Sequence, residues 1–268
     1  MKRFAKSLLA IFSVFVLTAF FASVPYSQES TERAKQILEM TYQKYKNLLK
    51  EDGEGLKSIA ATVSIKGGGQ MPMGDSGSMP MDIDAVVELY AVRPRHLYVD
   101  ISANLGNAKI IVAGKEKVTA TILLPSTKQF TAIDVPQKYI EKTQGDEPEK
   151  PDRMEELLKE AILAYEGTHE TKAGKAHKIV INPRDPKEKG SVAVYILDDR
   201  WDPVRFEASD PEGGGVVVNF EKLELNVDIP DERFVPATEG YTQISKEQLT
   251  TVLMMQLMAV MMQQEKQE

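Results

Sequence analysis

Three histidines, His96, His169 and His177, are the side chains in this chain best suited to acid–base catalysis or metal binding. Their separations match none of the short spacings that hold zinc, and the chain contains no cysteine. It also lacks a Gly-x-Ser-x-Gly nucleophile motif and a His-Glu-x-x-His zinc motif. We therefore expect the histidines to be surface or strand residues, and the protein not to be an enzyme.

Two acidic pairs, Asp82 with Asp84 and Glu147 with Glu149, fall in polar turns or at strand edges, where solvated charge is the expected state. The glycine run Gly213–Gly215 joins two predicted strands and precedes no helix, so it predicts a hairpin turn and not a phosphate-binding loop. Neither feature indicates catalysis.

Four methionines, Met71, Met73, Met79 and Met81, lie in a glycine-rich stretch, 67–81, that predicts a loop. Thioethers are soft ligands that suit Cu(I), which is one interpretation of this stretch. The other is a flexible apolar loop at the mouth of a cavity, because methionine adapts to varied apolar shapes. No histidine or cysteine accompanies the methionines, so we expect neither a metal nor a cofactor.

The composition is that of a globular protein, with 268 residues, of which 42% are hydrophobic and 27% charged. The net charge of −7, without blocks of Lys and Arg, argues against a nucleic-acid partner. The first residues predict an export signal over 1–27, with Lys2, Arg3 and Lys6 ahead of an apolar stretch from Leu8 to Ala22. An uncleaved N-terminal membrane anchor is the alternative.

Alternating apolar and polar residues predict antiparallel strands along most of the remaining chain. The expected strands are 58–66, 82–90, 96–102, 108–113, 117–124, 128–134, 176–182, 190–197, 203–209 and 215–225. Three- and four-residue apolar spacings predict two helices, 32–49 with Thr31 as its N-cap and 152–165 with Asp152 as its N-cap. So many strands with so few helices leave an apolar sheet face that must enclose side chains or a ligand.

A series of motifs in a fixed order gives the chain a resemblance to the LolA/LolB-like lipoprotein-carrier superfamily. It is most similar to LolA-type outer-membrane lipoprotein carriers. The motifs are Arg93-Pro94, Gly114-Lys115, Pro125, the predicted helix 152–165, Asn182-Pro183, Asp210–Gly213, Asn226 and Phe234–Pro236. The chain departs from the family pattern at Ala113, which replaces an aspartate, in the 67–81 stretch, and in the tail after Ser245.

This resemblance implies an α+β fold: a half-open, strongly curved antiparallel β-barrel covered by lid helices around an apolar cavity. The predicted domain spans 28–243, followed by a methionine-rich C-terminal helix over 244–268. By the same resemblance, Arg93 hydrogen-bonds to the lid and gates the cargo, for which the fixed donor fork of a guanidinium is suited. The alternative is a solvated arginine at a strand end.

Two sets of apolar residues are the remaining candidates for the site. The predicted cavity lining is Ile83, Val87, Leu89, Leu97, Val99, Ile101, Leu157 and Ile162. In the tail, Gln256 is the only polar residue between Val252 and Met262, and a helix that is apolar on nearly all sides must be buried or in contact with a partner. The residues Ser245 and Gln248 predict a capping box at its start. The tail lid candidates are Leu253, Met254, Leu257, Met258 and Met261, and the alternative is a helix that docks on the outer face of the sheet.

The resemblance implies a periplasmic carrier that reversibly binds the acyl chains of a lipoprotein or lipid and transfers them towards the outer membrane. Such a carrier needs an inner-membrane donor, an outer-membrane acceptor and transient membrane contact, and it needs no cofactor. The alternative is an envelope-stress sensor of the RseB/MucB type that uses the same lipid-binding cavity.

Overall fold

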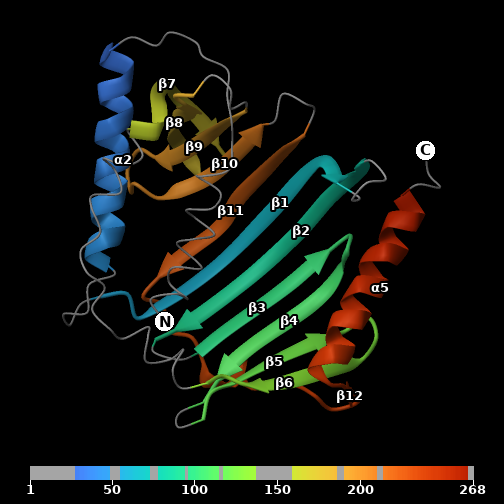
Figure 1. Ribbon diagram of the computed structural model, residues 1–268. Coiled ribbons are helices and arrows are strands. Elements are labelled where there is room, and N and C mark those ends of the chain that lie inside the picture. Colours follow the sequence, from blue (N-terminus) through green and yellow to red (C-terminus); the bar gives the residue numbers. More distant parts are fainter. Residues whose placement is uncertain are drawn as a thin grey trace. The chain divides into compact units, whose positions relative to one another are not determined.

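The computed structural model describes residues 28–48, 55–72, 78–93, 96–114, 117–136, 159–185, 190–209 and 214–264. The chain folds into two compact units. The first contains Leu56–Gln144 and Lys222–Glu268, and the second contains Lys2–Gly55 and Gly145–Glu221. Their labelled elements are drawn in Figure 1.

The first unit is an antiparallel sheet with one short parallel strand at its edge. Its strands are β1 (Ser58–Pro72), β2 (Ser78–Val92), β3 (His96–Ala103), β4 (Gly106–Ala113), β5 (Thr119–Leu124), β6 (Gln129–Asp134) and β12 (Thr242–Gln243). The order is β12-β6-β5-β4-β3-β2-β1, and only β12 runs parallel to its neighbour. This unit also contains the 3₁₀ helix η2 (Asp231–Phe234), the α-helix α5 (Lys246–Gln264) and the last residues of β11, which lie beside β1.

The second unit is a sheet with one helix. Its elements are α2 (Gln28–Leu48), β7 (Ala161–Thr171), β8 (Gly174–Pro183), β9 (Ser191–Leu197), β10 (Pro203–Ser209) and most of β11 (Gly215–Leu225). The order is β11-β10-β9-β8-β7, and the paired neighbours are antiparallel. Helix α2 packs against the edge strand β7 (Figure 1), where Ala34 and Ile37 are fully buried.

The predicted α+β class and the antiparallel pairing are confirmed. Each of the ten predicted strands is present, and most boundaries agree within two residues because the alternation that predicts a strand also sets its buried face. The edge strands β12 and β7 each have one neighbour in the described part of the chain, so the sheet is open.

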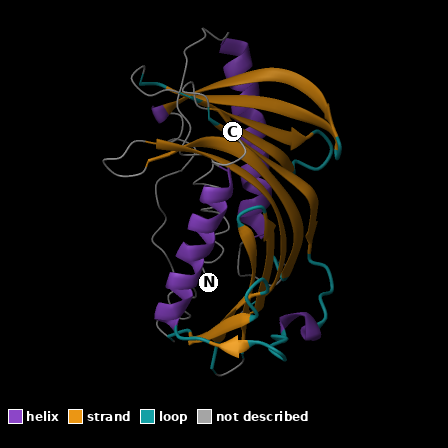
Figure 2. Cartoon of the chain, turned by 90° about the vertical axis from the view of Figure 1, so that its right-hand side faces the viewer, coloured by secondary structure: helices purple, strands orange, loops and turns teal. Residues whose placement is uncertain are grey.

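One face of the first unit's sheet carries a core beneath η2. Ala60, Ile111 and Leu123 are buried there together with Ile229 and Phe234 from the segment that leads into and through η2. Helix α5 lies on the other face. In Figure 2, η2 and α5 are seen on opposite sides of this sheet. The two faces are therefore covered by different parts of the C-terminal segment.

The predicted helix 152–165 is wrong in its last part, because Ala161–Thr171 is the strand β7. Ile162 therefore lies half-buried in a strand, paired with Asn182, and not on a lid helix. Both faces of this strand are covered, so Ala161, Leu163 and Ala164 form a continuous apolar run that lacks strand alternation. Residues 152–158, including the predicted lining residue Leu157, lie outside the described residues.

Two smaller predictions are also corrected. Thr31 lies inside α2, which begins at Gln28, and its hydroxyl donates to the Leu163 carbonyl of β7 instead of capping the helix. Much of the predicted 67–81 loop is strand, because β1 and β2 continue as a long hairpin in which Met71 pairs with Met79. Thr31 therefore makes a tertiary contact instead of a cap, and the 67–81 stretch is strand because the pairing of β1 and β2 continues into it.

The predicted signal over 1–27 lies outside the described residues, and the predicted domain bounds remain predictions. Among the helices that the structure describes, none combines the length and apolarity that crossing a bilayer requires.

Candidate apolar binding face

Cross-strand register gathers apolar side chains on one face of the first unit. The pairing aligns Ala61, Leu89, Val99, Ile110 and Ile122 across β1 to β5, and residues two apart on a strand share a face. We call this the apolar face. Its large half-buried side chains on β1 to β5 are Ile59, Val63, Ile65, Ile83, Val87, Leu89, Val99, Ile101, Ile110, Val112 and Ile122, and its two buried ones are Leu97 and Leu124.

The apolar face has no polar side chain among its described positions on β1 to β5. The opposite face is mixed, with ion pairs between Lys66 and Asp84 at 3.1 Å and between Lys109 and Asp100 at 2.6 Å. The hydrogen bond from Lys109 to Asp100 raises the pKa of that lysine above its ordinary value. On β6 the same register brings in Gln129 and Thr131, so the purely apolar part of the face is that on β1 to β5. A half-buried surface without a hydrogen-bonding group can bind apolar matter and has no means to bind a polar ligand specifically.

The sequence-predicted lining residues on β2 and β3 all share this face. Ile83, Val87 and Leu89 come from β2, and Leu97, Val99 and Ile101 from β3. Leu97 is 5% exposed, and the others are half-buried. Their role in lining a ligand cavity remains a prediction.

Sequence reasoning missed the contribution of β4 and β5, whose apolar-face residues include Ile110, Val112 and Ile122. The alternation of Ile110 and Val112 with Lys109 and Ile111 carried a weak signal, since two neighbouring isoleucines hide which one faces the core. Strand register resolves it, because it places Ile110 opposite Val99.

Helix α5 begins at the edge of the sheet and crosses towards the hairpin turns. Leu249 in its first turn is 6% exposed. Further along, the Gln256 side-chain amide donates to Ser126 Oγ at 3.4 Å, and a Cβ on Gly106 would lie 3.7 Å from Gln256 Oε1. Gly106 pairs with Ala103 in the register of the apolar face, so α5 lies over the ends of the strands on that side (Figure 2).

The predicted C-terminal helix and its capping box are confirmed. The Gln248 N–H donates to Ser245 Oγ at 3.2 Å, and the Ser245 N–H donates to Gln248 Oε1 at 2.8 Å. Three tail candidates are exposed: Leu253 at 43%, Met254 at 54% and Met258 at 60%. The side chains of Leu257 and Met261 lie outside the described residues, and the lid role of all five remains a prediction.

Arg93 follows β2 as an exposed turn residue, and its backbone N–H donates to the Lys57 carbonyl at 2.9 Å. Its neighbours Pro94 and Arg95 lie outside the described residues. The gating role that the sequence resemblance implies for Arg93 remains a prediction.

The three histidines lie in strands, as the sequence predicts. His177 is buried on β8, with Nε2 2.8 Å from Asp198 Oδ1, Nδ1 3.1 Å from Tyr165 Oη, and its ring stacked on Trp201. No group of three or more potential metal-binding His, Asp or Glu residues occurs in the described part of the chain. These contacts account for His177 as part of the packing of the second unit.

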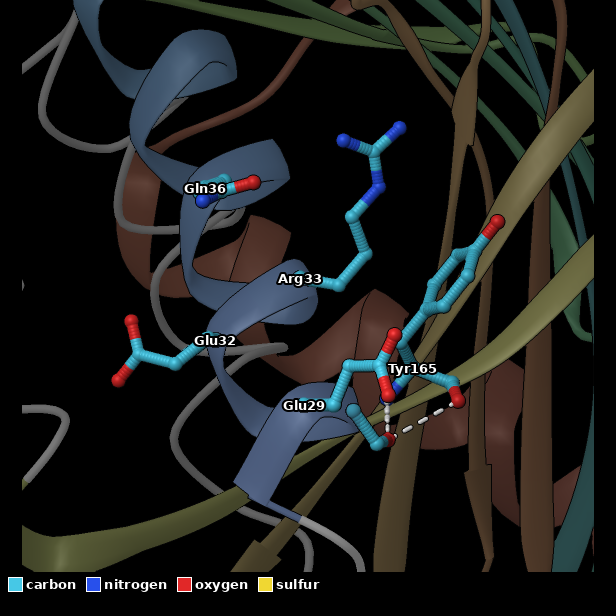
Figure 3. Close-up of a pocket in the computed structure, with 6 residues that line it drawn as sticks. Glu29, Glu32, Arg33, Gln36 and Tyr165 are labelled. Carbon is cyan, nitrogen blue, oxygen red and sulfur yellow. Dashed lines mark hydrogen bonds between the residues drawn. The ribbon is translucent and has the colours of Figure 1, made fainter.

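An open hollow lies between α2 and β7 in the second unit (Figure 3). The residues that line it all carry polar groups: Glu29, Ser30, Glu32, Arg33, Gln36 and Tyr165. The Ser30 hydroxyl accepts the Tyr165 N–H at 2.8 Å and donates to the Tyr165 carbonyl at 3.1 Å. A side chain of α2 therefore hydrogen-bonds both backbone groups of this residue in the edge strand. The hollow is therefore a feature of the helix–strand junction.

No family model matches the chain. An uncharacterised protein of Methanocaldococcus jannaschii is 28% identical over 101 residues, which make up 37% of this chain and 28% of that relative. The match thus spans less than a third of the relative's length.

Several solved structures are similar in part. An uncharacterised conserved protein of Thermus thermophilus has a TM-score of 0.41 at 16% identity, with 79% of this chain and 99% of that chain covered. A Vibrio parahaemolyticus domain described as an outer-membrane lipoprotein-sorting protein has a TM-score of 0.27 at 10% identity, with 76% and 97% covered. The MucA/MucB complex of Pseudomonas aeruginosa has a TM-score of 0.37 at 10% identity, with 80% and 64% covered. All three TM-scores are below 0.5, so the function is to be inferred from the site itself.

Proposed function

We propose that the protein reversibly binds the alkyl chains of a lipoprotein or lipid on the apolar face and carries them without covalent chemistry. The observation that carries this proposal is the set of half-buried branched side chains that five strands contribute to one face, among them Ile65, Val87, Val99, Ile110 and Ile122. A contiguous apolar surface that stays half-exposed is typical of a site where another molecule binds.

The chemistry of the face favours an alkyl chain over other apolar ligands. A ligand with internal hydrogen-bonding groups would lose its water contacts on this face and gain no partner, at a cost of about 1–3 kcal/mol for each unpaired group. A methylene chain has no such groups and gains about 0.8 kcal/mol for each buried CH₂. A chain of roughly fifteen carbons would therefore gain on the order of 12 kcal/mol before ordering costs. Burial alone is enough to hold it.

The same proposal includes the location of the protein and the route of its cargo. The apolar face is covered by helices, and the protein acts in the periplasm after export. Its cargo comes from a donor at the inner membrane and goes to an acceptor at the outer membrane, with transient membrane contact at each. The motif series from Arg93 to Pro236, with its resemblance to LolA-type carriers, supports these assignments.

Native mass spectrometry of the protein purified from its own cells tests this proposal. We expect a reproducible mass increment that chloroform extraction removes, and fatty-acyl chains in the extract. The extracted protein should regain an increment when it is mixed with a long-chain fatty acid. Finding only unliganded protein, together with no uptake by the extracted form, would reject the carrier function.

A further inference from the structure

Helix α5 is firmly attached at its first turn. The preceding strand β12 pairs with β6, where the Thr242 N–H donates to the Lys128 carbonyl at 2.9 Å and the Ile244 N–H to the Phe130 carbonyl at 2.8 Å. The capping box at Ser245 and the burial of Leu249 complete this attachment. The start of α5 is therefore fixed to the edge of the sheet.

Beyond that turn, the described contacts are few. The amide of Gln256 reaches Ser126 Oγ at 3.4 Å, which is long for a hydrogen bond, and both residues belong to solvent-accessible parts of the surface. Gln256 is also the only polar residue from Val252 to Met262. The one polar side chain of this segment thus makes its only described side-chain hydrogen bond to the turn that ends the β5–β6 hairpin.

The rest of α5 presents apolar surface to water. Met254, Met255 and Met258 are 54%, 65% and 60% exposed, and Leu253 is 43% exposed. A helix that is apolar on all sides is stable only when more of its surface is buried than this. With about 3.6 residues per turn, Met254, Met255 and Met258 lie on the side of α5 away from Leu249 and Gln256, so they add nothing to its attachment to the sheet.

We propose that α5 is a hinged cover of the apolar face: it pivots at Ser245, and the contact between Gln256 and Ser126 is the latch. The alkyl chain of the ligand enters beneath the helix, between α5 and the apolar face. This inference rests on the proposed function and adds to it the element that admits the ligand. The anchored first turn and the weakly held remainder of α5 are the two features that a hinged cover requires.

A reversible cross-link tests the hinge. Because the chain contains no cysteine, the double variant Ser126→Cys with Gln256→Cys has a unique pair of thiols, which a bis-maleimide with an internal disulfide can join. We expect the cross-linked protein to take up a fluorescent long-chain fatty acid at least tenfold more slowly than wild type. Reduction of the linker should restore the rate. The control is the same double variant blocked at both thiols with N-ethylmaleimide, which should take up the probe as fast as wild type or faster.

A second variant tests the contact between Gln256 and Ser126. Ser126→Ala removes the acceptor of the Gln256 amide, so uptake should be two- to threefold faster, whereas Thr127→Ala, in the exposed neighbour of Ser126, should leave the rate unchanged. Equal uptake by the cross-linked and reduced forms would overturn the hinged cover while leaving the proposed function standing. No uptake by any form, wild type included, would reject the proposed function and the inference with it.

Discussion

Ser245 and Gln248 close the first turn of α5 from both sides, since each side chain accepts the backbone N–H of the other residue. These two hydrogen bonds give acceptors to two of the backbone N–H groups that are otherwise left without partners at a helix start. It fixes where α5 begins, and with it the point about which the helix can move.

Loss of this cap should loosen α5. Ser245→Ala should lower the free energy of opening of the helix by about 1 kcal/mol, because one N–H group then lacks its partner. Hydrogen exchange of the α5 amides measures this loss directly. Thr251→Ala is the matched control: it replaces an exposed mid-helix residue with a better helix former, so protection should stay the same or rise. Unchanged protection in Ser245→Ala would show that the cap doesn't hold the helix.

Asn226 should stabilise the first unit by two separable effects. Its φ of +58° is a left-handed conformation, and its Oδ1 accepts the Lys57 N–H at 2.7 Å. Asn226→Ala should lose both and lower the unfolding free energy by about 2 kcal/mol. Asn226→Gly keeps the backbone freedom and loses only the side-chain bond, so it should lose less. Thermal unfolding checks the order, and equal losses would contradict the role of the backbone conformation.

The stability of the second unit should fall at alkaline pH through Tyr45. Burial, and secondarily the nearby Asp202 carboxylate that accepts its hydroxyl at 2.8 Å, raise the pKa of Tyr45 well above its ordinary value. The unfolded chain therefore releases this proton first, and the free energy of unfolding decreases as pH rises above about 10. Tyr45→Phe should weaken this dependence. Urea titrations of both proteins between pH 9 and pH 11 would show parallel decreases if the account of Tyr45 is wrong.

Much of the sheet could be predicted because alternating residues report a strand with one covered face. β7 could not, since Ala161, Leu163 and Ala164 are all buried and the alternation disappears where both faces are covered. The helix α5 and its cap could be predicted from local sequence alone. Its placement could not, because the contact between Gln256 and Ser126 joins residues 130 positions apart.

The residues of the apolar face could also be predicted only in part. The residues of β2 and β3 could be predicted from alternation, with Val87, Val99 and Ile101 as examples. The share contributed by β4 and β5 depends on which residue pairs with which across strands, and a shift of one position would turn Ile110 to the other face. Register of this kind is a property of the folded sheet.

Two neighbouring residues on β3 test most directly whether the alkyl chain binds on the apolar face. Ile101 lies half-buried on the apolar face, and Ser102 lies exposed on the opposite face. The same substitution, Ile101→Gln and Ser102→Gln, places one amide on each face of the sheet. Titration with a fluorescent long-chain fatty acid, alongside thermal unfolding to confirm that both variants fold, gives their dissociation constants. Binding on the apolar face predicts affinity at least tenfold weaker for Ile101→Gln and unchanged for Ser102→Gln. Equal affinities for the two folded variants would contradict it.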